Sequence, residues 1–291
     1  MSLTSDYTTP LIGNPYYRST GIIKAADLNG ARYCIAEISY ERFDDQNFQY
    51  IVSPYWEQIA FLPTQVFSGI PGFDLSARRD HYYRVNITPS FIQMRTPSES
   101  REDLWDLLAE VGLDYYDRFE WLLRSEKRCG DDNLIVVRKR ENRQFDGSAP
   151  GFCLNDLQPG DLVSLNHLYD ISTGNTEFAS CAYRLLVNGA TVYLVDEGRS
   201  LTAFESRTML YLLNCMLEYT ENYAAIRQEQ GIRRAREAGK YPGRSRISVD
   251  PLLLKQIARQ FQAGEISEEE ALKTLHISRS TFYRRLREQN L

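Results

Sequence analysis

The chain has 291 residues, of which 43% are hydrophobic and 25% charged, with a formal net charge of −5. This composition is typical of a soluble globular protein with two or three domains. No apolar run reaches the ~18 residues of a membrane span, and no secretory signal opens the chain, so we expect a cytoplasmic, nucleoid-associated protein without membrane contact.

Cysteine and histidine usage argues against a metal centre. The cysteines are odd in number, scattered and never in a CxxC pair, which speaks against both a disulfide framework and a zinc site: Cys34, Cys129, Cys153, Cys181 and Cys215. Only three histidines are present. We therefore expect no metal.

The charge is divided unevenly along the chain. Residues 227–291 contain 14 Lys and Arg against 8 Asp and Glu, a net charge of +6, whereas residues 1–226 carry −11. An acidic body with a basic tail suits a protein that contacts nucleic acid at one end.

Residues 1–128 are predicted to form a β-rich, α+β extension of unknown role. The runs ARYCIAEISYERF and NFQYIVSPYW are typical of strands, and SFIQM, near Phe91, is a candidate short strand. TPSESREDLWDLLAEVGL then predicts a helix capped by Ser98 or Ser100, with an apolar stripe that includes Leu104, and YDRFEWLLRSEK predicts a second helix. We see no catalytic constellation in residues 1–88 and expect the N-terminal region to bring a protein partner, an effector or a second activity.

Residues 129–238 predict an α/β region. LIVVRK, LVSLN and TVYLVD are short apolar strands, and the helix TEFASCAYRLLVNG separates the last two. Strand, helix, strand at this spacing implies a right-handed crossover and a small parallel sheet. No GxGxxG or GxxxxGK[ST] motif follows a strand, so we expect no nucleotide and no other cofactor.

One long helix should run from about Ala203 to Ala238, with a length of ~54 Å at 1.5 Å per residue. Its first half carries an expected apolar stripe, and its second half is basic. We predict that residues 203–226 pack on their own domain and on a partner subunit, giving a homodimer. The alternative is an ordinary core helix with a solvated end. The expected stripe consists of Phe204, Met209, Leu213, Met216, Tyr223 and Ile226.

Residues 239–291 predict an arm followed by three short helices. Gly239 and Pro242 end the long helix, and the arm presents Arg244 and Arg246, which suit a narrow minor groove. In the helices we expect Leu253, Ile257, Phe261, Phe282 and Leu286 to face inward, a capping box of Ser267 and Glu270, and Ser278 as the cap of the last helix.

These helices have the spacing of a helix-turn-helix, whose second helix lies in the major groove. Its first turn would offer Arg279, Ser280 and Thr281 to base edges. Tyr283, Arg284 and Arg287 would then contact phosphates. A helical hairpin without a DNA-binding role is the alternative.

From about Gly160 to Arg244 the chain resembles the serine recombinases, the family of resolvases and DNA invertases. GDLVSLN is similar to the family strand before its Asp-Arg motif, and GATVYLVDEGRS to a strand that ends in acidic residues. Residues 206–244 are similar to the family's dimerisation helix and linker, and the tail extends the likeness to Leu291. The resemblance implies a resolvase-like α/β fold, a homodimer and binding to double-stranded DNA.

The family's catalytic pattern is degenerate in this chain. Its Asp-Arg-x-x-Arg motif is replaced by residues 169–173, YDIST, and its Glu-Arg pair by Thr220 and Glu221, although Arg227 matches a family arginine. Arg95 and Ser98 are the nearest match to its Arg-x-Ser nucleophile, with Ser98 one position late. Phosphoryl transfer needs those positive charges.

The sequence therefore favours a site-specific DNA-binding protein without catalytic activity, in a regulatory or architectural role. One alternative is an active serine recombinase that uses Ser98, Arg95 and Arg227. Another is an N-terminal effector enzyme or toxin that a helix-turn-helix tail directs to DNA.

Overall fold

The computed structural model describes residues 8–172, 177–239 and 248–288. They belong to two compact units, residues 1–221 and 222–291, each considered by itself below. The fold is mixed α/β, with one antiparallel sheet, one mixed sheet and several helices. Within the described ranges, no helix combines the length and apolar character required to cross a membrane.

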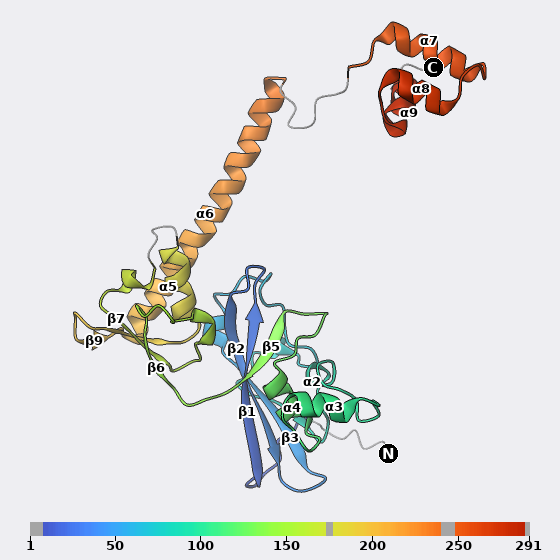
Figure 1. Ribbon diagram of the computed structural model, residues 1–291. Helices are drawn as coiled ribbons and strands as arrows, with labels where there is room; N and C mark the ends of the chain where they lie inside the picture. The colour runs from blue at the N-terminus through green and yellow to red at the C-terminus, as the bar shows by residue number, and fades with distance from the viewer. Residues whose placement is uncertain (1–7, 173–176, 240–247, 289–291) are drawn as a thin grey trace. The chain divides into compact units, whose positions relative to one another are not determined.

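An antiparallel sheet dominates the N-terminal part of the first unit (Figure 1). Its strand order is β4-β3-β2-β1-β5, and every neighbouring pair is antiparallel. The expected β-rich region corresponds to this sheet. Its strands are β1 (Tyr17–Ala26), β2 (Arg32–Arg42), β3 (Phe48–Pro54), β4 (Tyr82–Val85) and β5 (Leu134–Arg138).

Short helices connect these strands. They are α1 (Trp56–Ile59), η1 (Leu75–Ala77), α2 (Ser90–Gln93), α3 (Leu104–Glu110) and α4 (Arg118–Ser125). The expected strand SFIQM is wrong, because α2 occupies it: the neighbours Phe91 and Ile92 are both buried, as one turn of helix permits. The expected caps are wrong too. Asp103 precedes α3, and the hydroxyls of Ser98 and Ser100 lie 2.9 Å from each other.

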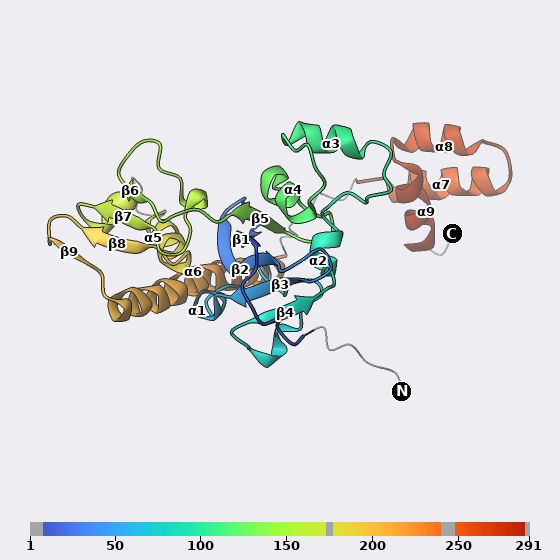
Figure 2. The same ribbon diagram turned by 90° about the horizontal axis from the view of Figure 1, so that it is seen from below.

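Helix α4 packs against β1 and β5, and Figure 2 shows it on one face of the sheet. The close approach depends on Gly21 of β1. A Cβ atom at this position would lie 2.6 Å from Leu123 Cδ2 and 2.7 Å from Val136 Cγ1. A larger residue here would therefore displace the side chain of Leu123 in α4 or of Val136 in β5.

The second sheet has the order β6-β7-β8-β9. Helix α5 (Phe178–Val187) joins β7 to β8, which are parallel as expected, while β9 returns antiparallel to β8. The short helices η2 (Leu154–Asp156) and η3 (Leu168–Ile171) flank β7. The strands are β6 (Gln144–Asp146), β7 (Leu162–Leu165), β8 (Thr191–Leu194) and β9 (Arg199–Ser200).

The expected boundary before residue 129 does not separate the two sheets. LIVVRK, expected to open the α/β region, is β5 and pairs with β1 in the N-terminal sheet. Polar side chains also link the sheets. Lys24 of β1 is buried, and its Nζ donates 2.7 Å hydrogen bonds to the carbonyls of Asn155 and Leu157 before β7. Both sheets therefore lie in one compact unit.

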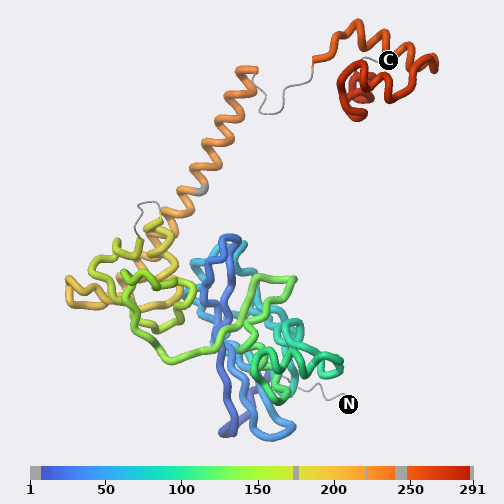
Figure 3. Tube along the Cα trace, in the orientation of Figure 1, coloured from blue at the N-terminus to red at the C-terminus, as the bar shows by residue number. Residues whose placement is uncertain are grey.

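Helix α6 (Ala203–Glu237) is continuous, in agreement with the expected long helix (Figure 3). Its expected stripe is only partly correct. Leu213 is buried and Met209 is partly buried. Leu210, which the expected stripe omitted, is also buried. The other members of the expected stripe are exposed: Phe204, Met216, Tyr223 and Ile226.

Three short helices with a core of their own follow: α7 (Pro251–Gln262), α8 (Glu268–Leu275) and α9 (Arg279–Glu288). Ile257, Phe282 and Leu286 are buried and Phe261 is partly buried, as expected. The expectation for Leu253 is wrong, since its neighbour Leu254 faces the core. The capping box of Ser267 and Glu270 is present.

Candidate nucleic-acid interface

The turn before α9 is fixed by backbone conformation and side-chain contacts. His276 ends α8 with a left-handed φ of 50°, and buried Ile277 anchors the turn. The carbonyl of Ser278 accepts a 2.9 Å hydrogen bond from Phe282 N–H. The Ser278 hydroxyl lies 3.0 Å from that of Thr281 and 3.2 Å from that of Ser280. The structure thus places Ser278 directly before the helix that it was expected to cap.

Helix α9 has one apolar and one basic face. Phe282 and Leu286 point into the core, where Phe282 makes an edge-on contact with Phe261 at 5.6 Å between ring centroids. Ser280, Arg284 and Arg287 are exposed, and their spacing of four and three residues places them on one side of the helix. Thr281 and Tyr283 are half-buried between the faces. Within the described part of the chain, the residues expected to contact DNA therefore lie on α9 or, in the case of Ser278, directly before it.

Arg279 is the most constrained of these side chains. Its Nε lies 2.7 Å from Glu268 Oε1 in α8, and its guanidinium carbon lies 6.0 Å from the Tyr283 ring centroid. The side chain is nevertheless 72% exposed. An exposed ion pair of this kind stabilises by at most about 1 kcal/mol, so a base edge or phosphate can replace Glu268.

Helix α9 has more positive than negative side chains. The helix contains four arginines and one glutamate, and Arg285 pairs with that residue, Glu288, at 3.0 Å. Anionic Glu268 and Glu269 lie in the first turn of α8. The positive charge is therefore concentrated on α9. Arg244 and Arg246 of the expected arm lie outside the described residues.

Arg95, expected as a phosphate ligand if the chain were catalytic, is buried. Its guanidinium pairs with Asp132, donates a 2.8 Å hydrogen bond to the Phe91 carbonyl and stacks 4.1 Å from the Phe91 ring centroid. Ser98 is exposed in the loop after α2. Arg227 is exposed on α6, 5.6 Å from the Tyr223 ring centroid. Arg95 has a structural role in this arrangement.

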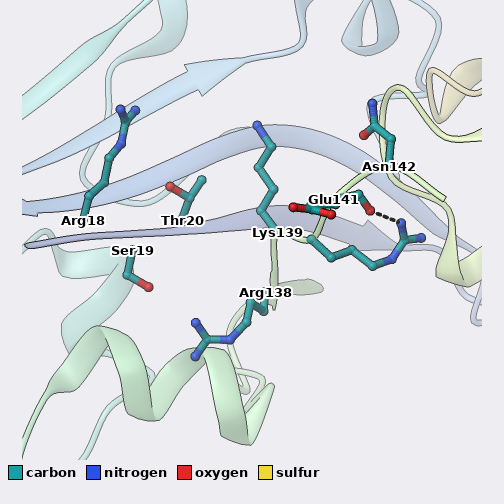
Figure 4. A pocket seen from close by; sticks show the side chains of 8 residues that line it. Arg18, Ser19, Thr20, Arg138, Lys139, Glu141 and Asn142 are labelled. Carbon is teal, nitrogen blue, oxygen red and sulfur yellow. Dashed lines mark hydrogen bonds between the residues drawn. The ribbon is translucent and has the colours of Figure 1, made fainter.

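Sequence reasoning missed a second basic cluster, for which the run RKRENR at residues 138–143 was the available signal. Arg18, Arg138, Lys139 and Arg140 line a hollow of about 570 Å³ at the end of β5. Figure 4 shows Arg18 and Lys139 pointing to one side of the strands and Arg138 to the other. Each cation also pairs with a carboxylate, of Glu41, Glu120, Glu37 and Asp161. This cluster therefore offers no continuous cationic surface.

In the comparisons with known proteins, no family model matches this chain and no curated protein sequence matches it. The evidence for a nucleic-acid interface therefore comes from the arrangement of α7, α8 and α9 and from the basic face of α9.

Proposed function

We propose that the protein is a homodimeric, site-specific binder of double-stranded DNA that has a regulatory or architectural role and no catalytic activity. The observation that carries this proposal is the basic, exposed face of α9, mounted on a small helical unit with a well-packed core. In this arrangement α8 and α9 act as a helix-turn-helix, and α9 enters the major groove.

The first turn of α9 reads the bases and its later turns contact the backbone. Arg279 is suited to bidentate hydrogen bonding with guanine, and Ser280 and Thr281 present hydroxyls beside it. Arg284 and Arg287 follow on the exposed face, one and two turns further along. Arg244 and Arg246 add minor-groove contacts in this proposal.

The dimer forms through the exposed apolar side of α6. Leu212, Met216, Tyr219, Tyr223 and Ile226 follow the alternating spacing of four and three residues that defines a coiled-coil seam. Their side chains are 47–67% exposed in the single chain. A contiguous apolar stripe of this kind is typical of a protein interface. Two-fold symmetry then predicts an inverted repeat as the DNA target.

The absence of strand cleavage follows from charge. Arg95 is held by Asp132 and Phe91. By the resemblance, Asp170 stands in the sequence at a position where the family has an arginine. Loss of one such donor typically costs about 10² in rate, and several are missing. We therefore expect DNA binding without a covalent protein–DNA adduct.

The proposal is tested by sequencing the DNA fragments that the full-length protein retains from a random pool. Arg279→Ala should weaken binding to the selected site by about 1–3 kcal/mol and relax the preference at one base position per half-site. Arg259→Ala removes the same charge from exposed α7 and should leave the preference unchanged. Retention of random DNA without an enriched sequence would contradict site-specific binding. A covalent adduct that is lost in Ser98→Ala would establish the recombinase alternative instead.

A further inference from the structure

A hollow of about 460 Å³ lies beside the carboxyl ends of the parallel strands β7 and β8. The segment after β7 supplies His167, Leu168 and Tyr169, β8 supplies Leu194, and the first turns of α6 supply Phe204 and Met209. All of these residues belong to the first compact unit. The volume falls within the range of ~300–1,000 Å³ that is typical of small-molecule sites.

The walls of this hollow are apolar and its rim is aromatic. Leu194 is buried, and Leu168 and Met209 are partly buried, so they form an apolar floor. Tyr169 is 61% exposed and Phe204 is 78% exposed. The Tyr169 ring also stacks on His167, with centroids 4.7 Å apart and planes inclined by 18°. The hollow is therefore lined by two exposed rings, of which Tyr169 is held by its stacking on His167.

The charges around the hollow are predominantly negative. His167 Nε2 lies 3.2 Å from Asp196 Oδ2, and its Nδ1 lies 3.8 Å from Asp170 Oδ2. On the other side, Arg199 donates 2.9 Å hydrogen bonds to both carboxylate oxygens of Glu205.

The carboxylates outnumber the positive groups around this opening. Glu197 also pairs with Arg199, at 2.8 Å, so the single guanidinium is shared between two carboxylates. Hydrogen bonds from Arg199 and Thr202 lower the pKa of Glu205 to about 2, which keeps this residue ionised. Glu197 and Glu205 line the hollow together with Arg199 and His167, and the carboxylates of Asp170 and Asp196 pair with the His167 imidazole.

We propose that this hollow binds a small organic cation, an ammonium group on an aromatic or aliphatic body. The apolar body would contact Leu168, Leu194 and Met209, which removes apolar surface from water. The ammonium group would be attracted by the carboxylates and by the faces of Tyr169 and Phe204. The excess negative charge disfavours an anion at the same place. This site is distinct from the proposed DNA interface and would give the first unit a ligand of its own.

The test is a titration of the full-length protein with 2-phenylethylammonium chloride, followed by ligand-observed NMR. The neutral analogue 2-phenylethanol and the anionic analogue phenylacetate serve as matched probes of similar size. We expect the amine to bind at least about tenfold more tightly than phenylacetate, because only the amine complements the carboxylates. Equal binding of the amine and phenylacetate would overturn the proposal.

Two variants locate the site. Phe204→Ala and Asp196→Asn should each weaken binding of the amine by about fivefold or more, through loss of a ring face and of a negative charge. Tyr211→Ala removes an exposed ring from the same helix outside the hollow and should leave binding unchanged. Phe204 and Tyr211 are both exposed, so Phe204→Ala and Tyr211→Ala should preserve the fold. Circular dichroism of each variant verifies this. Amine binding that survives both Phe204→Ala and Asp196→Asn would contradict this location.

Discussion

Single side chains in this protein show how one residue type can serve opposite purposes. Arg95 is buried against Asp132, whereas Arg279 is exposed beside Glu268. The sequence predicted a base contact for Arg279, and it offered Arg95 as a phosphate ligand only in the alternative of an active recombinase. The partner of Arg95 lies 37 positions away, so no local pattern could reveal the buried ion pair.

Replacement of Arg95 by alanine should destabilise the fold by about 3–5 kcal/mol, because it leaves the Asp132 carboxylate without its charged partner. Urea denaturation of the purified variant measures this loss. Arg101→Ala is the matched control, since Arg101 forms an exposed pair with Asp103 and should change stability by less than about 1 kcal/mol. Equal effects of the two substitutions would contradict a structural role for Arg95.

Buried tyrosines should make the protein sensitive to alkali. Burial, reinforced by Asp27, raises the pKa of Tyr33 to about 12, and burial also raises the pKa values of Tyr50 and Tyr183. Between pH 10 and 12 the unfolded chain releases these protons while the folded chain retains them. The free energy of unfolding therefore falls as pH rises through this window.

Urea denaturation at pH 9 and pH 11 measures this loss, and Tyr33→Phe should reduce the difference between the two values. If the free energies of unfolding of wild type and Tyr33→Phe differed by the same amount at pH 9 and pH 11, Tyr33 would not contribute to the loss. Lys24 acts in the opposite direction, because burial lowers its pKa and the cost of burying its charge disappears as pH rises.

At the scale of elements, some local signals were reliable, whereas the sheet to which β5 belongs could not be read from its own residues. The extent of α6 and the capping box of α8 follow from patterns within a few residues, and both could be predicted. Strand β5 could not be assigned correctly, because it pairs with residues 21–25 of β1, more than 100 positions earlier. The Leu253 error has a local origin: three consecutive leucines leave the helical phase undefined by one position.

The exposed stripe of α6 yields a test of the proposed dimer. Met216→Asp and Tyr219→Asp should each raise the dimer dissociation constant by about 100-fold, because each would bury an unpaired charge in the seam. Sedimentation equilibrium measures this constant. Ala224→Asp introduces the same charge at an exposed position on the other side of the helix and should leave the dimer intact. An unchanged dissociation constant in both seam variants would rule out this face.

At the scale of the whole molecule, the sequence indicated the mixed α/β class and a separate C-terminal helical unit. It did not indicate that the two sheets belong to one compact unit. That connection depends on buried polar contacts such as Lys24 with the carbonyls before β7, and on Asn188 Oδ1, which accepts a 2.8 Å hydrogen bond from Cys34 N–H. The residues that form these contacts are more than 120 positions apart in the chain.

The division of charge along the chain predicts how DNA affinity depends on salt. A dimer that neutralises about six phosphates should lose about 10³ in affinity between 50 and 200 mM salt, since each contact releases condensed counterions. Fluorescence anisotropy with the selected inverted repeat measures this slope. In the proposed complex Arg287→Ala would remove one phosphate contact per subunit, which should make the logarithmic slope shallower by about 2. A slope that Arg287→Ala leaves unchanged would place that arginine, and with it the exposed face of α9, away from the DNA backbone.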